Sequence, residues 1–152
     1  MTKGSKSGLY DLHGMIVDSR KGFAQAARHA TDVHVSGFLR VLSAERHNIG
    51  AELGRLLPEM DAEEPRGKGT FLGGLHRAWM HLHTTVRANG NAALLAACAR
   101  GEKSLLMRYD HLLATDGFSM DARRVLQRQR ALVKDQRERV KQLHTQFRKF
   151  EK

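Results

Sequence analysis

Residues 119–150 read SMDARRVLQRQRALVKDQRERVKQLHTQFRKF, and this stretch decides the fold. Positions 122, 126, 129, 133, 136, 140, 143, 147 and 150 follow a strict heptad, and seven of these nine residues are apolar. Apolar residues at alternating steps of three and four form one stripe on a helix, whereas a half-buried strand alternates at every second residue. The stretch therefore predicts one long amphipathic helix of about 32 residues, or roughly 48 Å.

The same spacing of apolar residues occurs in three segments upstream. Residues 9–30 predict a first helix, and residues 33–57 predict a second, with Asp32 as its N-cap and Pro58 at its end. Residues 91–115 predict a third long helix, which a following Asp-Gly pair closes. Because each helix has one apolar face, the four can bury these faces against one another.

A longer connection joins the second and third of these helices. Residues 59–69 contain four acids and two glycines, as loops do, and residues 70–86 predict a short crossover helix that ends before the break at 89–91. Two hairpins joined by a crossover are typical of a ferritin-like plan. We therefore predict an all-α fold, an antiparallel ferritin-like four-helix bundle, as one domain over residues 9–152 after a flexible N-terminus of residues 1–8.

The composition predicts a soluble protein. The chain has 152 residues, of which 41% are hydrophobic and 28% charged, as in ordinary globular domains. It contains no run of about 18 apolar residues that could span a membrane, and its first residues lack the apolar stretch of a signal peptide. We therefore expect a cytoplasmic protein without membrane insertion, in which the single cysteine, Cys98, is a buried core residue.

Several polar side chains interrupt the apolar stripes. They are Arg20 on the first predicted helix, Glu45 and Glu52 on the second, Glu102 and Tyr109 on the third, and Gln129 and Gln136 on the fourth. Burying an ionised group costs several kcal/mol unless a partner compensates. We expect these side chains to meet in one polar core layer, in which Arg20 neutralises a carboxylate site made by Glu52 and Glu102. The simpler interpretation is that some of them lie at the edge of the seam and reach water.

A metal site is the alternative use for these carboxylates. Di-metal bundles take one Glu from each of two helices and a Glu-x-x-His pair from each of the other two. This chain has neither pair, and its nearest analogues are residues 45–48 and 135–138. We expect no cofactor, with Arg20 in the place of a metal. In the alternative, iron or manganese would be bound by the carboxylates of the stripes, Glu45, Glu52, Glu102 and Asp18.

Two motifs resemble those of a known family. They are Gly74-Leu-His-Arg-Ala-Trp-Met80 and Leu95-Ala-Ala-Cys-Ala-Arg-Gly-Glu102, the second followed by Tyr109. The chain resembles, over roughly residues 9–143, an uncharacterised bacterial family of ferritin-like four-helix-bundle proteins, a domain of unknown function. The resemblance implies the bundle and a relation to metal-binding ferritin-like proteins, but it implies no activity.

The chain departs from this family where the family has potential metal ligands. Acidic residues are common in the family where this chain has Arg20, Lys21 and Leu132, and a histidine is common near Arg137. Only two carboxylates carry over, Glu52 and Glu102. The resemblance therefore favours a non-catalytic structural or interaction role, stress-related by analogy with other bundles, over oxidase chemistry.

The basic end of the chain suggests two kinds of partner. From Ser119 onward there are eleven Lys and Arg against four Asp and Glu. A third hypothesis is therefore non-specific nucleic-acid binding through the last helix. The phosphate contacts would be Arg123, Arg124, Arg128, Arg130 and Lys134. The apolar stripe also continues through Phe147 and Phe150 beyond the reach of the shorter first helix, so we expect a homodimer or another protein to cover this end.

Overall fold

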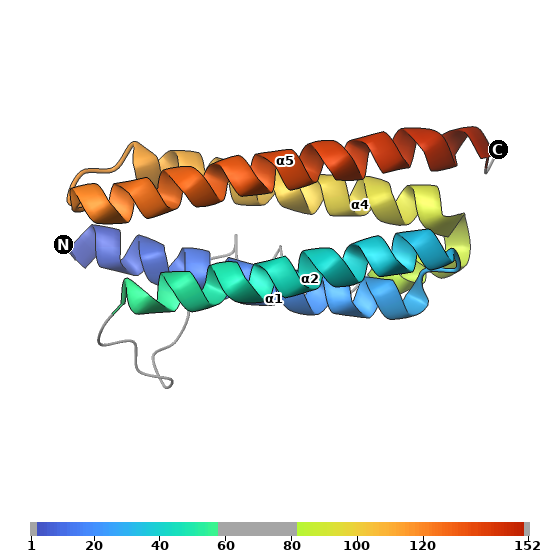
Figure 1. Ribbon diagram of the computed structural model, residues 1–152, viewed down its shortest axis with the longest axis horizontal. Helices are drawn as coiled ribbons and strands as arrows, with labels where there is room; N and C mark the ends of the chain where they lie inside the picture. The colour runs from blue at the N-terminus through green and yellow to red at the C-terminus, as the bar shows by residue number, and fades with distance from the viewer. Residues whose placement is uncertain (1–2, 58–81, 151–152) are drawn as a thin grey trace.

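The computed structural model describes residues 3–57 and 82–150, which form four long helices. The helices are α1 (Lys3–His29), α2 (Val33–Arg55), α4 (Leu82–Leu113) and α5 (Met120–Phe150) (Figure 1). The described ranges contain no strand. The predicted all-α fold, built of four packed helices, is confirmed.

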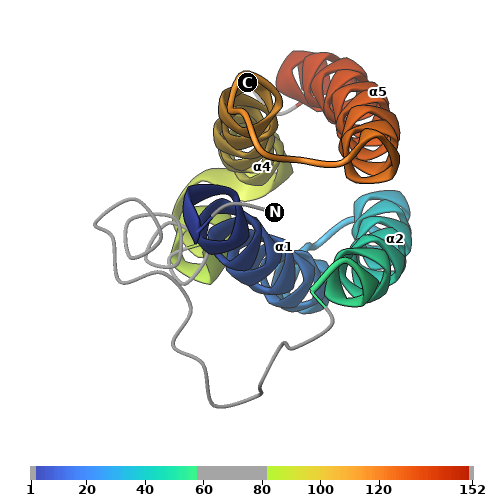
Figure 2. The same cartoon turned by 90° about the vertical axis from the view of Figure 1, so that its left-hand side faces the viewer.

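The helices pack as two hairpins. α1 runs antiparallel to α2, α4 runs antiparallel to α5, and α2 and α4 run in the same direction (Figure 1). Seen end-on, the four helices surround a common centre (Figure 2). The backbones approach closely between α1 and α2, between α4 and α5, and between α1 and α4. On the remaining side, between α2 and α5, long polar side chains bridge the gap, and this side holds the candidate site.

The apolar stripes identified in the sequence face this centre. On α5, the heptad positions from Ala122 to Val140 are buried, and Leu143 and Phe147 are partly buried against the core. Phe150, by contrast, is 84% exposed. Burying each large apolar side chain contributes about 1.5–3 kcal/mol, so the stripe rather than intrinsic helix propensity stabilises α5.

The helix boundaries follow capping chemistry. The side chain of Asp32 accepts hydrogen bonds from the backbone N–H groups of His34 (2.8 Å) and Val35 (3.0 Å), so the predicted N-cap of α2 is confirmed. The Ser119 hydroxyl accepts one from the backbone N–H of Ala122 (3.1 Å) at the start of α5. The predicted start of the first helix, by contrast, was too late. α1 begins at Lys3, so residues 3–8 form its first turns, and Ser5 is already buried there.

Gly90 marks a break inside α4. Its φ of 84° and ψ of −172° are non-helical and lie where glycine is favoured, so the predicted break at 89–91 is present. Directly after it, the Asn91 amide accepts a hydrogen bond from the Thr31 backbone N–H (3.2 Å) and donates one to the Thr31 hydroxyl (2.9 Å). These bonds tie the start of the straight part of α4 to the turn between α1 and α2.

The predicted connection between the second and third helices falls largely outside the described residues. This applies to the loop at 59–69, to residues 70–81 of the expected crossover helix, and to the motif at 74–80. Residues 82–89 are helical and form the first part of α4. Within the ranges that the structure describes, no helix is long and apolar enough to cross a membrane.

Candidate functional site: a buried arginine in the bundle core

Arg46 on α2 is fully buried and is the largest fully buried side chain of the described residues. Its Nη1 donates a 2.7 Å hydrogen bond to Oε1 of Glu102 on α4, and its Nη2 donates to Oε2 of the same carboxylate. Nη2 also donates to Oε1 of Gln136 on α5 (2.6 Å), and Nη1 lies 3.3 Å from the Ser19 hydroxyl on α1. A planar guanidinium matches a carboxylate in this two-bond geometry. One arginine thus joins all four helices.

Two further carboxylates meet amides of α5. The Nε2 group of Gln136 donates to Glu45, and that of Gln129 donates to Oε1 of Glu52 at 2.7 Å. The Tyr109 hydroxyl donates in turn to Oε1 of Gln129 at 2.9 Å. We call the whole set the polar layer: Ser19, Glu45, Arg46, Glu52, Glu102, Tyr109, Gln129 and Gln136.

Arg20 does not belong to the polar layer, so its predicted role was wrong. Its side chain is partly exposed at the outer edge of α1, and the Ser43 hydroxyl donates to its backbone carbonyl at 2.9 Å. Arg46 occupies the position in the polar layer that was predicted for Arg20. The other six predicted side chains all make contacts within the layer, although Glu102 pairs with Arg46 and Glu52 does not.

Arg46 was not among the predicted site residues, although the sequence contains a signal for it. Arg46 follows Leu42 by four residues and precedes Ile49 by three, so it occupies a central position of the stripe on α2. Arg20 has the same spacing, four residues after Ile16 and three before Phe23, yet it is partly exposed and its neighbour Ser19 is buried instead. Periodicity in the sequence therefore does not separate the two arginines, and the packing of the helices does.

One donor of Arg46 has no hydrogen-bond partner. Among the described residues, its Nε is the only buried side-chain nitrogen or oxygen without one. The Phe23 ring lies over the guanidinium, with Cζ 5.3 Å from the ring centroid. This cation–π contact compensates part of the cost of burying the charge.

The electrostatics of the layer differ between its centre and its edge. Burial raises the pKa of Tyr109 above its ordinary value, so its hydroxyl stays protonated and donates to Gln129. At the edge, partial burial raises the pKa of Glu52, but hydrogen bonds from Arg128 and Gln129 outweigh that effect and the pKa is lowered overall. Glu52 is therefore held as a carboxylate.

The carboxylates do not assemble into a set of metal ligands in the described part of the chain. No group of three or more His, Cys, Asp or Glu side chains there is arranged to hold an ion. Glu102 faces a guanidinium, Glu45 and Glu52 each face an amide of α5, and Asp18 is partly exposed on α1.

Three of the five predicted nucleic-acid contacts have partners inside the protein. Arg123 donates to two backbone carbonyls at the end of α4, which caps that helix. Arg128 forms an ion pair with Glu52 of α2, and Arg130 forms one with Asp110 of α4. All three side chains join α5 to another helix, and acidic partners neutralise the charges of Arg128 and Arg130.

The other two predicted contacts are exposed on α5. Nη1 of Arg124 lies 3.6 Å from Oδ1 of Asp121, one turn earlier, and the side chain of Lys134 is exposed. Some basic side chains of this surface thus pair with acidic residues of the same helix, as Lys141 also does with Glu138 (3.7 Å). The positive charge of α5 is less concentrated than its composition indicates.

Cys98 gives a direct test of the core. It is fully buried on α4, and burial raises the pKa of its thiol above the ordinary range. Since the thiolate is the reactive form, we expect the native protein to leave Cys98 unmodified by a disulfide reagent at neutral pH, and the denatured protein to react completely. Mass spectrometry measures the modified fraction, and rapid modification of native protein would contradict this packing.

Comparison with known proteins identifies a family. No curated protein and no solved structure matches the chain. A family model described as a domain of unknown function (DUF2383) matches residues 6–115, which include Arg46, Glu102 and most of the described helical core outside α5. Because this match covers most of the chain, the protein belongs to the DUF2383 family.

Proposed function

We propose that this protein is a ferritin-like four-helix bundle in which an arginine replaces the metal centre, and that it serves as a non-catalytic structural or interaction protein. The observation that carries the proposal is the position of the Arg46 guanidinium. It is fully buried and is bonded to Glu102 and Gln136 from the two helices opposite.

The chemistry of the polar layer supports a structural role. In a di-metal bundle, inward-facing carboxylates neutralise two cations, which supply the reactive positions. Here the cation is the guanidinium of Arg46, which is part of the chain. One of its partners is the neutral amide of Gln136, and the neighbouring Glu52 faces the neutral amide of Gln129. A guanidinium has a fixed charge, transfers no electrons and offers no open coordination position. The layer is therefore suited to fixing the arrangement of the helices.

The chain path supports the ferritin-like plan. α2 and α4 run in the same direction, and the straight part of α4 starts beside the α1–α2 turn, at the end of the bundle opposite the end of α2, so the chain crosses from one end to the other between them (Figure 1). Such a long crossover between the second and third long helices distinguishes ferritin-like bundles from bundles with short loops only. The interaction surface predicted at the end of α5, around the exposed Phe150, stays a prediction.

Metal titration tests the proposal. Protein purified without chelator should contain far less than one equivalent of iron or manganese, and adding Fe(II) or Mn(II) under anaerobic conditions should not raise its melting temperature. Elemental analysis and calorimetry measure both. One equivalent or more of bound metal that is lost in Glu102→Gln, with the helical circular dichroism signal retained, would establish the di-metal alternative instead.

A further inference from the structure

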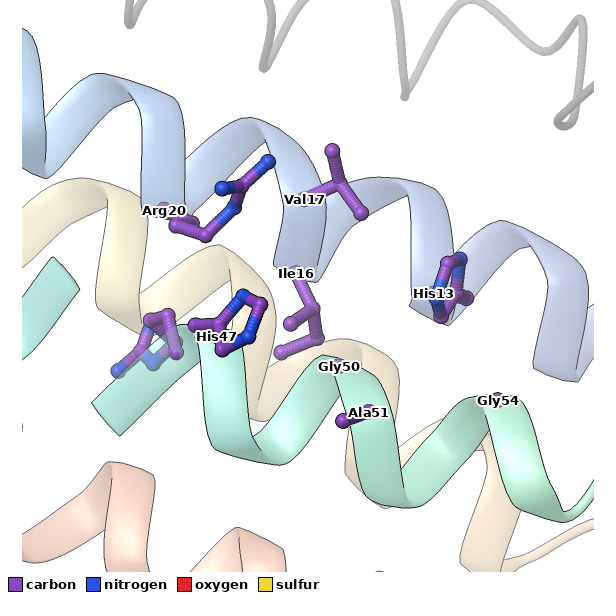
Figure 3. A pocket seen from close by; sticks show the side chains of 9 residues that line it. His13, Ile16, Val17, Arg20, His47, Gly50, Ala51 and Gly54 are labelled. Carbon is purple, nitrogen blue, oxygen red and sulfur yellow. The ribbon is translucent and has the colours of Figure 1, made fainter. Parts of the chain in front are cut away.

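The outer side of the α1–α2 hairpin carries a hollow with a basic rim. It has a volume of about 300 Å³, and His13 and Arg20 of α1 and His47 of α2 line it. Arg20 and His47 lie opposite each other, and His13 lies further along α1 (Figure 3). The floor on the α2 side is made of small residues, Gly50, Ala51 and Gly54. The lining also includes Ile16 and Val17 of α1 and the buried Arg46 of α2, so the basic side chains flank a floor of small and apolar residues.

A second basic hollow follows along the same two helices. Lys21, Arg28 and Arg40 line it with three small or neutral residues, and its volume is about 510 Å³. Because α1 and α2 are antiparallel, the two hollows follow each other along the hairpin. The first lies between residues 13–20 of α1 and 46–54 of α2, and the second lies between residues 21–28 of α1 and 40–43 of α2. We call the two hollows together the basic groove, with the basic residues His13, Arg20, Lys21, Arg28, Arg40 and His47.

In the described part of the chain, acidic side chains do not neutralise the four Arg and Lys residues of the basic groove. None of the described residues that line the two hollows is Asp or Glu. In the described part of the chain, the ion pairs involve none of the side chains of Arg20, Lys21, Arg28 and Arg40. On α5, by contrast, arginines pair with Glu52, Asp110 and other acids. A concave surface lined with charges of one sign concentrates the electrostatic field and attracts counter-ions.

The shape and the side chains of the groove select among anionic ligands. From His13 to Arg28, α1 rises about 22 Å, so the basic residues form a row rather than a single cluster. A row of cations suits a ligand with repeated negative charges. Proteins that bind single-stranded nucleic acid place aromatic rings along such a row to stack the bases. Among the described residues that line the two hollows there is no Phe, Tyr or Trp.

We propose that the basic groove binds a linear chain of phosphate groups without bases, namely inorganic polyphosphate. Arg20, Lys21, Arg28 and Arg40 contact successive phosphates, and the small residues of α2 leave room for the chain on the floor of the first hollow. Binding releases counterions from the polymer, so it weakens steeply as salt increases. Arg46 of the polar layer also lines the first hollow, but the four proposed phosphate contacts lie outside that layer, so the polyphosphate site does not depend on the function proposed for the layer.

The test compares two double variants that remove the same charge from different places. Arg20→Gln/Arg40→Gln changes the basic groove, and Arg124→Gln/Lys134→Gln makes the matched change on α5. All four side chains are at least partly exposed, so both proteins should keep the wild-type melting temperature. The probe is fluorescently labelled linear polyphosphate of defined length, and anisotropy is measured at several salt concentrations.

We expect the groove variant to bind polyphosphate about tenfold or more weakly with a shallower salt dependence, and the α5 variant to bind like the wild type. A third variant, Ala51→Glu, places a carboxylate on the exposed floor and should weaken binding, whereas Ala51→Gln should not. Absence of binding at low salt, or equal weakening in the groove and α5 variants, would overturn the proposal. Tighter binding of single-stranded DNA would assign the groove to nucleic acid, and saturation by orthophosphate alone would reduce it to a small-anion site; either result overturns the polyphosphate assignment.

Discussion

Replacing Arg46 by methionine should lower the free energy of unfolding by about 3–5 kcal/mol at neutral pH, the usual scale for breaking a buried ion pair. Methionine fills much of the same space but removes the charge. It leaves the Glu102 carboxylate buried without its counter-charge and Gln136 without a donor. Urea denaturation followed by circular dichroism measures the change.

The loss should shrink in mild acid. In Arg46→Met the buried Glu102 becomes cheaper to bury once it takes up a proton, so the folded state of the variant holds that proton more tightly than the unfolded state does. When the folded state binds more protons, lowering the pH favours folding. The difference in the free energy of unfolding between Arg46→Met and the wild type should therefore be smaller at pH 5 than at pH 7.

Arg20→Met provides the matched control, because it makes the same chemical change one helix away. Arg20 is partly exposed and lies outside the polar layer, so its loss should change stability by no more than about 0.5 kcal/mol. If Arg20→Met costs as much as Arg46→Met, or if Arg46→Met is as stable as the wild type, then Arg46 does not organise the core.

The fold was predictable because its strongest signals are local. The heptad of α5 and the Asp32 cap of α2 each depend on residues within a few turns of one another, and periodicity and capping report such relations directly. The start of α1 was missed because its first residues give no such local signal. Residues 3–8 are all polar or glycine, so they contribute no apolar residue to the stripe of α1. Ser5 is buried by tertiary packing, which local patterns do not report.

Six members of the polar layer were predictable, but its central arginine, Ser19 and the connections between the side chains were not. A polar residue on an apolar stripe needs a partner, and that argument found Glu102, Gln129 and Gln136. Choosing the partner requires knowing the rotation of each helix to within a fraction of a turn. An error of this size exchanged Arg46 for Arg20.

The charge pattern shows a related limit of sequence reasoning. Counting basic residues indicated α5 as the anion-binding helix, yet Arg128 pairs with Glu52, which is 76 residues away in the chain. Composition cannot detect such neutralisation. Conversely, the basic residues of α1 and α2 are diluted in sequence but converge in the basic groove once the hairpin forms.

Glu102→Met should destabilise the protein by about 3–5 kcal/mol as well, but with a different response to pH. This change leaves the buried guanidinium of Arg46 without its carboxylate. An arginine keeps its charge at every pH at which proteins fold, so mild acid offers no relief. The stability gap to the wild type should therefore be the same at pH 5 and pH 7, whereas the gap of Arg46→Met narrows.

Combining the two changes completes a double-mutant cycle. In Arg46→Met/Glu102→Met both charges are gone and two apolar side chains of similar volume face each other, an exchange that is often nearly neutral for a buried ion pair. We expect the double variant to be more stable than either single variant, with a coupling free energy of at least about 2 kcal/mol. Additive losses in the double variant would mean that Arg46 and Glu102 contribute independently, and the bidentate pair would then not be what holds α2 to α4.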